Sequence, residues 1–286
     1  STRVRSSAAS DVYKRQLPTF AYTVDITTLG AKGDGITDNT AFIQKAIDDC
    51  SARKGGTVEI PSGHFLTRTL FLKSNVNLHL HFGAELLGST DLDSYHKVFP
   101  ELKGKESPAL IFARGVANIA ITGSGTINGQ GAHQNFQHGN DSKGGPRRPK
   151  IIYFIGCNNV RVQDVTLRNS AYWTQDYEKC NGVIVRGVKV YSHANWNNDG
   201  LDIDSRNVVV SDCYIDCDDD ALCLKSDTDT PCENVTVTNC VLKSNCNAIK
   251  FGTSSYSGFK NVTISNCTID LSLIHISEPT RQEAIS

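Results

Sequence analysis

Segments in which apolar and polar residues alternate recur along the chain. Three of them align without gaps in steps of 27 residues and begin at Asn207, Asn234 and Asn261. Weaker copies with unequal spacing begin at Asn75, Asn118, Asn159 and Gly182. Alternation with period 2 is typical of a half-buried strand, and the β-branched residues of these segments favour strands. The repeats therefore predict coils of short strands, each stacked on the next.

A stack of such coils is a parallel β-solenoid, so the fold class that we expect is all-β. Its inward side chains should form rows from coil to coil. The rows expected in the three best repeats hold the valines Val208, Val210, Val235 and Val237 and the cysteines Cys213, Cys240 and Cys267.

One helix is predicted before the repeats, from about Asn39 to Ala52. Its cap candidates are Thr37, Asp38 and Asn39, because each can accept a hydrogen bond from a free N–H of the first turn. Its apolar face should consist mainly of Ala41, Ile43, Ala46 and Ile47. Such a short N-terminal helix could cap the open end of the solenoid and protect its edge.

Composition narrows the class of protein. The 286 residues are 39% hydrophobic and 21% charged, which excludes a disordered chain, and no apolar stretch is long enough to span a membrane. The formal net charge of −1 argues against a nucleic-acid binder. The sequence predicts a monomer that binds neither nucleic acid nor membrane.

The two ends of the sequence look foreign to the fold. Residues 6–16 (SSAASDVYKRQ) and 271–281 (LSLIHISEPTR) resemble in-frame translations of the transposase adapters used in DNA library preparation. We therefore expect residues 1–16 and 271–286 to be adapter-derived tails. Residues 17–270 would then be a β-helix catalytic domain that is truncated at its C-terminus, and any signal peptide would be absent from it.

The ten cysteines leave several interpretations open. Those in register are expected to pack as small apolar residues. Cys217, Cys223, Cys232 and Cys246 lie near the acidic segments described below and could form disulfides. A metal site is not expected, because no two C-x-x-C pairs occur. The N-x-T sequons at Asn234, Asn261 and Asn266 fall inside the repeats, which favours a role in forming the coil over glycosylation.

Two acidic segments carry the candidate chemistry: Asn195–Ser205 and Cys217–Ser226. When one coil is laid over the next, the side chains that coincide are Leu201 with Leu222, Ile203 with Leu224, Asp199 with Asp220, Asn198 with Asp219, and Asp202 with Cys223. The 27-residue step then places Asn247 on Asp220 and Lys250 on Cys223. Asp199, Asp219 and Asp220 should therefore converge on one outer face, with Asp202, Lys225 and Lys250 beside them.

Three carboxylates on strands about 4.8 Å apart repel one another, so at least one should hold a proton near neutral pH. A protonated acid beside an ionised one is what general acid–base hydrolysis requires. The residues alone also allow a calcium site or a solvated acidic turn.

Several motifs resemble those of glycoside hydrolase family 28, the polygalacturonase family of pectin-degrading enzymes. The opening motif is Leu29–Ile47 (LGAKGDGITDNTAFIQKAI), followed by Gly55–Phe65 and by Gly125–Gly131 (GTINGQG). The N-T-D motif of the family corresponds to Asn197-Asn198-Asp199, and its D-D motif to Asp219-Asp220. The resemblance covers nearly all of residues 20–270. It implies a right-handed parallel β-helix and an inverting, cofactor-free hydrolase of α-galacturonosyl linkages in polygalacturonan or rhamnogalacturonan.

The resemblance also implies roles for individual residues. Asp219 would be the general acid, and Asp199 and Asp220 would hold and activate the attacking water. The expected substrate-binding residues are Asn197, Asp202, Lys225, Asn247 and Lys250. Neighbouring coils would bring the carboxylates closer than the roughly 6.5–9.5 Å usual for inversion, and we give the resemblance precedence over that rule.

Two departures from the family pattern concern the residues that bind the substrate. Its G-H-G motif aligns with Cys246-Asn247-Ala248, so Asn247 stands where the family has His. Its R-I-K motif should fall at or beyond residue 270, so the pair that binds the galacturonate carboxylate cannot be located. A solenoid cut within its stack exposes an unpaired edge and an apolar end, so we expect the chain as given to be poorly soluble or inactive. Trp173 and Trp196 are candidates to stack on sugar rings, and His193 is a candidate substitute for the missing His.

Two other functions remain alternatives at this point. A pectate-type lyase would need Ca²⁺ and a basic catalytic residue, and no Arg is expected on the outer face between the two acidic motifs. A non-catalytic polysaccharide-binding module would not need the three acids to converge. The expected partner is a pectic polysaccharide or oligogalacturonide, and the expected location is secreted or periplasmic.

Overall fold

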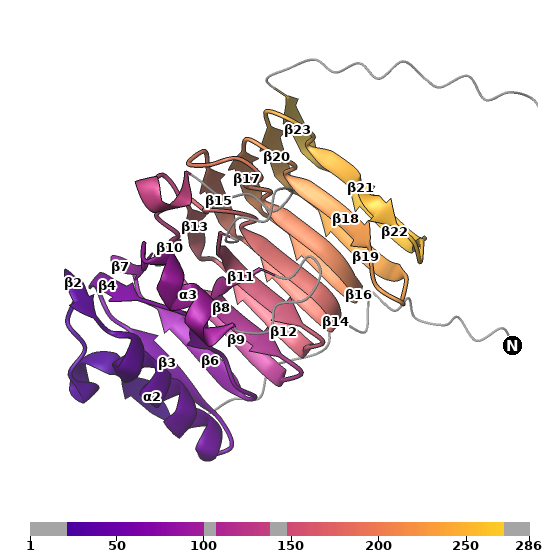
Figure 1. Ribbon diagram of the computed structural model, residues 1–286. Helices are drawn as coiled ribbons and strands as arrows, with labels where there is room; N and C mark the ends of the chain where they lie inside the picture. Colours follow the sequence, from indigo (N-terminus) through magenta and orange to yellow (C-terminus); the bar gives the residue numbers. More distant parts are fainter. Residues whose placement is uncertain (1–21, 100–106, 138–147, 272–286) are drawn as a thin grey trace, which may run out of the picture.

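The computed structural model describes residues 22–99, 107–137 and 148–271. Parallel strands stack coil upon coil along one axis, from the indigo N-terminal end to the yellow C-terminal end in Figure 1. The predicted parallel β-helix is therefore confirmed. Residues 1–16 and 272–286, the expected adapter-derived tails apart from Leu271, lie outside the described residues.

The strands of the coils form three faces. The first face consists of β1 (Thr23–Asp25), β3 (Gly56–Ile60), β6 (Val76–Leu80), β9 (Ala117–Gly123), β12 (Asn158–Gln163), β19 (Cys232–Thr238) and β22 (Phe259–Ser265). The second consists of β5 (Leu70–Phe71), β8 (Ala109–Arg114), β11 (Lys150–Ile155), β18 (Leu222–Ser226) and β21 (Ile249–Ser255). The third consists of β2 (Asp34–Asp38), β4 (Gly63–Thr67), β7 (Ala84–Gly88), β10 (Thr126–Asn128), β13 (Thr166–Arg168), β15 (Lys189–Ser192), β17 (Tyr214–Cys217), β20 (Val241–Ser244) and β23 (Thr268–Leu271).

Two long strands, β14 (Gln175–Arg186) and β16 (Leu201–Ser211), join the first two faces. The first half of β14 pairs with β11 and its second half pairs with β12. The first half of β16 likewise pairs with β18, and its second half pairs with β19. The first two faces therefore meet along these strands, and the second face carries the acidic residues described below.

The core consists of the inward rows that the repeats predict. Val208 pairs in register with Val235, and Val210 with Val237, and all four side chains are buried. The cysteine row is also present, since the residues after Cys213, Cys240 and Cys267 pair in register along β17, β20 and β23. All ten cysteines are free thiols, so the disulfides left open by the sequence are not formed.

Asparagines form the corners between the first face and its neighbour. Asn234 has φ 55° and Asn261 has φ 53°, in the left-handed region that Asn adopts more readily than most residues. The Asn234 amide donates to Asn207 Oδ1 at 3.0 Å, and the Asn261 amide donates to Asn234 Oδ1 at 2.9 Å. The coil-forming role expected for these asparagines is confirmed.

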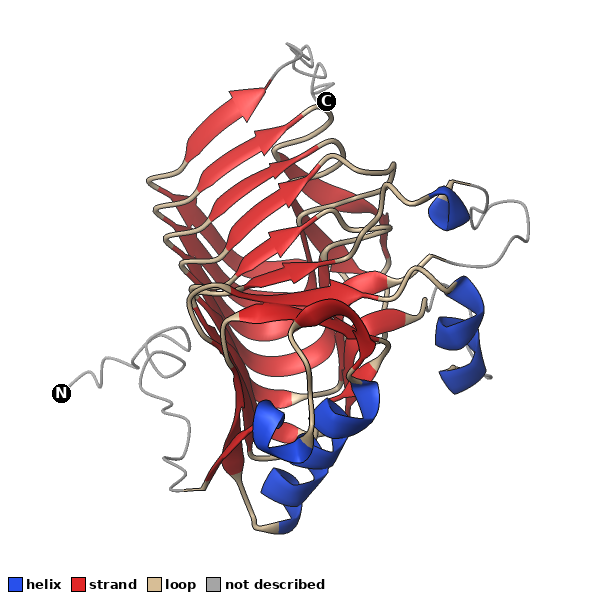
Figure 2. Ribbon diagram, turned by 90° about the vertical axis from the view of Figure 1, so that its left-hand side faces the viewer, coloured by secondary structure: helices blue, strands red, loops and turns tan. Residues whose placement is uncertain are grey.

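In the described part of the chain, four helical segments accompany the strands: α2 (Thr40–Ala52), α3 (Leu92–Val98), and the 3-10 turns η1 (Ile26–Leu29) and η2 (Gln134–Phe136). The helix α2 packs against β1, β3, β5 and β6 and covers the N-terminal end of the stack (Figure 2). No helix of the described residues is long and apolar enough to cross a membrane.

The predicted helix is present, but its apolar face differs from the prediction at one position. Ile43, Ala46 and Ile47 are fully buried as predicted, and Cys50 in the last turn is buried with them. Ala41, which was also expected on this face, is exposed. At about 100° per residue, Ala41 lies on the side of the helix opposite the buried stripe. The first-turn N–H of Thr40 is capped by Asp38 Oδ1 at 3.0 Å, while the Asn39 side chain bonds to the preceding loop.

Candidate active site

A row of outward side chains crosses the second face. Register pairs connect Tyr153 to Asp176, Asp176 to Asp202, Asp202 to Cys223 and Cys223 to Lys250. The row changes from aromatic to acidic to basic within five neighbouring strands. Two steps of it, Asp202 with Cys223 and Cys223 with Lys250, are those that the sequence register predicts.

Asp199 lies in the turn before β16, and Asp219 and Asp220 lie in the turn before β18, so all three precede the strands that carry this row. The Gly200 N–H donates to the Asp220 carbonyl at 2.8 Å, which sets the coil of Asp199 directly against that of Asp220. The Asp219 N–H donates to Asn198 Oδ1 at 3.0 Å, as expected from the coincidence of these two residues. Asn197, with φ 52°, makes the sharp corner that this arrangement requires.

The carboxylates of Asp199, Asp219 and Asp220 are brought together. Oxygens of Asp199 and Asp220 lie within 4.8 Å of each other, as do oxygens of Asp219 and Asp220. Asp199 is 4% exposed and Asp220 is 2% exposed, whereas Asp219 is only half-buried. The cluster thus has two enclosed carboxylates and one that faces the exterior.

Burial and mutual repulsion control the charge of the cluster. Burial raises the pKa of Asp199 well above its ordinary value of 3.8, and the carboxylate of Asp202 adds to the rise. Burial also raises the pKa of Asp202 to about 7, although the Lys225 ammonium, 3.0 Å away, opposes the rise. The structure therefore contains carboxyl groups that hold a proton near neutral pH.

Lys250 and Asn247 both contact Asp220 from the next coil. Lys250 Nζ donates to Asp220 Oδ2 at 2.8 Å, and the Asn247 amide donates to Asp220 Oδ1 at 2.7 Å. Together they stabilise negative charge on this carboxylate. Asn197, the remaining binding candidate, donates to Asp219 Oδ2 at 3.3 Å.

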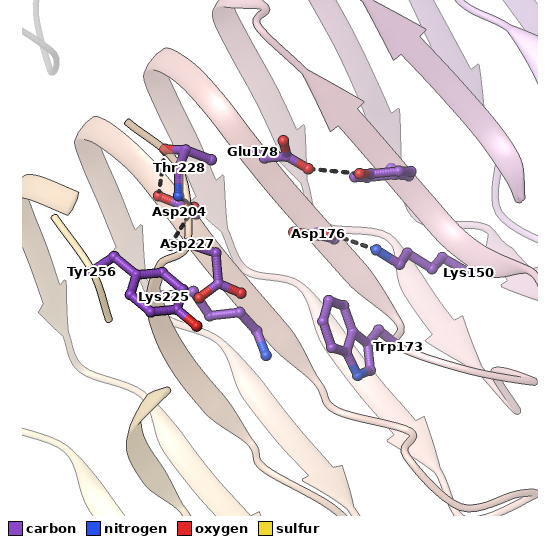
Figure 3. Close-up of a pocket in the computed structure, with 10 residues that line it drawn as sticks. Lys150, Trp173, Asp176, Glu178, Asp204, Lys225, Asp227, Thr228 and Tyr256 are labelled. Carbon is purple, nitrogen blue, oxygen red and sulfur yellow. Dashed lines mark hydrogen bonds and ion pairs between the residues drawn. The ribbon is translucent and has the colours of Figure 1, made fainter. Parts of the chain in front are cut away.

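A cavity of about 330 Å³ opens on the second face (Figure 3). Asp199, Asp219 and Asp220 do not line it, and Lys225, which lines it, forms an ion pair with Asp202 at 3.0 Å. Lys150 and Lys225 both line it, and their Nζ atoms lie 4.3 Å and 3.9 Å from the ring centre of Trp173. Lys150 is 1% exposed and forms an ion pair with Asp176 at 2.5 Å. The cavity thus combines an aromatic ring with two ammonium groups, a combination suited to an acidic sugar.

The outer wall of the cavity is acidic. Asp204 accepts the N–H of Asp227 at 3.0 Å and that of Thr228 at 3.2 Å, and burial raises its pKa to about 7. Glu178 accepts the hydroxyl of Tyr153 at 2.6 Å. Tyr256 completes the lining.

Sequence reasoning missed Lys150, Asp176, Glu178 and Asp204. Strand parity could have identified Asp204, since it lies two residues after the outward Asp202. The other three belong to coils with unequal spacing, for which no register could be read from the sequence.

Two of the looser candidates have other partners. His193 contacts Asp218 at 2.7 Å and Asp216 at 3.0 Å, and its role as a substitute for the missing His stays a hypothesis. Trp196 packs on the Arg148 guanidinium at 4.2 Å. Trp173 is the aromatic candidate that lines the cavity.

Comparison with known proteins shows where the chain belongs. It matches the family described as glycosyl hydrolases family 28 over residues 50–275. A probable polygalacturonase of Vitis vinifera is 31% identical over 73% of this chain and 45% of that protein. An exo-poly-alpha-D-galacturonosidase of Dickeya chrysanthemi is 30% identical over 70% of this chain and 41% of that protein. The chain therefore spans less than half the length of these curated relatives.

The likeness extends to three dimensions. The crystal structure of a hyperthermoactive exopolygalacturonase from Thermotoga maritima matches with a TM-score of 0.79 at 24% identity, over 92% of this chain and 72% of that chain. That likeness supports the right-handed parallel β-helix and no more than the fold. Taken with the family match over most of the sequence, it leads to one conclusion: this chain belongs to glycosyl hydrolases family 28.

Proposed function

We propose that the site hydrolyses α-galacturonosyl linkages in a pectic polysaccharide. The observation that carries the proposal is the convergence of Asp199, Asp219 and Asp220 beside a cavity lined by two lysines. The names of the curated relatives, a probable polygalacturonase and an exo-poly-alpha-D-galacturonosidase, point to the same substrate class.

Asp219 is the proposed proton donor. It is the half-buried member of the cluster, so its carboxyl group can reach the glycosidic oxygen of a chain lying across the face. During cleavage the bond between the anomeric carbon and this oxygen breaks, and the proton of Asp219 passes to the departing oxygen. General acid catalysis of this kind contributes about 10²–10⁴ in rate.

Asp220 and Asp199 would hold the attacking water between them. Their oxygens lie within 4.8 Å of each other, a separation at which one water can donate a hydrogen bond to each carboxylate. Lys250 and Asn247 stabilise Asp220 as an anion. Asp220 takes a proton from the water while the water oxygen forms a bond to the anomeric carbon. An attack from the face opposite the leaving group inverts the anomeric configuration.

The cavity would bind the galacturonate ring next to the cleaved bond. Lys225, held by Asp202, presents an ammonium group for the uronate carboxylate, and Trp173 presents a ring for the sugar. Because pectic polymers are too large to enter a cell, we propose that the parent protein acts outside the cytoplasm, as a monomer without membrane attachment.

The alternatives receive less support from the geometry. A calcium ion needs six to eight oxygen ligands, whereas Lys250 and Lys225 already place ammonium groups on Asp220 and Asp202. A lyase that depends on Ca²⁺ therefore fits the cluster poorly. A binding module would not require buried acids with raised pKa values, because such groups cost stability.

The test is product formation from polygalacturonate and from rhamnogalacturonan, with and without a chelator. Hydrolysis predicts new reducing ends in the presence of chelator and no ultraviolet absorbance from an unsaturated product. Activity that disappears with chelator and yields an unsaturated product would show a lyase. Binding without new reducing ends by a protein extended to the full length of its relatives would show a binding module.

A further inference from the structure

A second cluster of potential ligands lies on the first face, far along the stack from the acids. Glu59 is on β3, His79 is on β6, and His81 follows β6 directly. These strands lie at the indigo N-terminal end in Figure 1, whereas β16 and β18 of the acid cluster lie at the orange end. The cluster is therefore separate from the proposed active site.

The strand geometry places the three side chains on one outer surface. His79 and His81 are two residues apart, so both point to the same side of the chain. Glu59 pairs in register with His79 on the neighbouring strand. One ligand atom from each of the three residues lies within 4.8 Å of the other two, and Glu59 Oε2 contacts His81 Nε2 directly.

Hydrogen bonds fix the tautomer of His79. The Thr122 hydroxyl on β9 has one hydrogen, and it donates that hydrogen to Asn77 Oδ1 at 2.9 Å. The Thr122 oxygen must then accept from His79 Nδ1, which lies 2.8 Å away. Nδ1 of neutral His79 therefore carries the proton, and Nε2 carries the free lone pair that a metal ion needs.

This arrangement resembles the environment of a metal-binding histidine. Such a histidine normally donates its second ring N–H to an oxygen that orients the ring, as His79 does to Thr122. Two imidazoles and one carboxylate are a ligand set that Zn²⁺ accepts, with a fourth position left for water. The His81 side chain is 50% exposed, so an ion and its water can approach from solvent.

We propose that Glu59, His79 and His81 form a surface binding site for Zn²⁺ that ties β3 to β6. Thr122 is a positioning residue of this site. The proposal is independent of the proposed hydrolase activity, since no residue of the acid cluster takes part.

Isothermal titration of the chelator-treated chain, without a histidine tag, tests the proposal with ZnCl₂. The wild-type chain should bind one equivalent of Zn²⁺. His79→Ala should bind Zn²⁺ at least ~100-fold more weakly than wild type. Thr122→Val should weaken binding by ~10-fold while keeping the ligands, because the ring loses its orienting oxygen. Co²⁺ in place of Zn²⁺ should give the visible absorption of a tetrahedral site with nitrogen and oxygen ligands.

The matched control is His64→Ala. His64 contacts Glu85 Oε2 at 2.7 Å on the third face, so it is also an exposed histidine–glutamate pair. Its removal should leave zinc affinity unchanged. Glu59→Gln provides a second ligand variant if His79→Ala does not fold. Equal affinity in wild type and both ligand variants, or equal loss in His64→Ala, would overturn the proposal.

Discussion

The buried carboxylate of Asp204 should make the fold lose stability as the pH rises. Asp204 is 4% exposed, and burial raises its pKa from 3.8 to about 7, with a further contribution from Glu178. The folded chain therefore binds the Asp204 proton more tightly than the unfolded chain does. Its stabilising effect is complete below about pH 4 and is lost as the pH rises through about 7.

The size of the effect follows from the shift. About 3 pH units at roughly 1.4 kcal/mol each correspond to about 4 kcal/mol. The side chain borders a cavity open to solvent, so water screens part of this energy and we expect about 2 kcal/mol. Asp204→Asn removes the titrating group. Its amide can still satisfy the partners, since Oδ1 can accept from Asp227 and Thr228 and Nδ2 can donate to the Thr228 hydroxyl.

Urea unfolding of wild type and Asp204→Asn, followed by tryptophan fluorescence, measures the difference. Between about pH 4 and about pH 8 the free energy of unfolding of the variant should rise relative to wild type by about 2 kcal/mol. Asp229→Asn is the control. Lys179 lowers the pKa of Asp229 below 3.8, so Asp229 stays ionised between about pH 4 and about pH 8 and its removal should leave the profile over this range unchanged. Parallel pH profiles for wild type and Asp204→Asn would refute the reasoning.

Two further predictions concern stability. Lys150→Met should lower the free energy of unfolding by about 3–5 kcal/mol because it leaves Asp176 buried without its cation, and the double variant Lys150→Met/Asp176→Leu should recover most of that loss. Urea denaturation of wild type, Lys150→Met, Asp176→Leu and the double variant measures the cycle, and equal loss in Lys150→Met and the double variant would contradict it. Asn234→Ala should cost about 1 kcal/mol, and Asn234→Gly less, because Ala tolerates the left-handed corner poorly. Thermal unfolding measures the stability of both variants. A variant Asn234→Gly that is less stable than Asn234→Ala would contradict the need for a left-handed backbone at this position.

The sequence predicts the second half of the stack well for a physical reason. Alternation with period 2 fixes which side chains face inward, and the constant 27-residue step fixes how coils overlap. The pair Cys223 with Lys250 follows from the 27-residue step. Asp202 and Cys223 are 21 residues apart, and they coincide because Leu201 aligns with Leu222 and Ile203 with Leu224 as inward residues. The meeting of Asp199 with Asp220 is a consequence of the same register.

The first half of the site could not be predicted in this way. Lys150 reaches the cavity from β11 and Asp176 from β14, and loops of unequal length separate these strands from the acidic repeats. Trp173 and Tyr256 lie outside the regular alternation, so their meeting depends on the packing of loops. Ala41 is a different kind of error, because the 3.6-residue period of the helix places it opposite Ile43 and Ala46, and it is exposed.

The turnover of Asp219→Asn tests the central claim most directly, in a protein extended to the full length of its curated relatives. The account predicts that the rate of reducing-end formation from polygalacturonate falls by about 10²–10⁴ while affinity for oligogalacturonate is kept. Asp229→Asn, at an exposed residue that does not line the cavity, should keep the wild-type rate. An Asp219→Asn protein that cleaves polygalacturonate at nearly the wild-type rate would contradict the assignment of the proton donor.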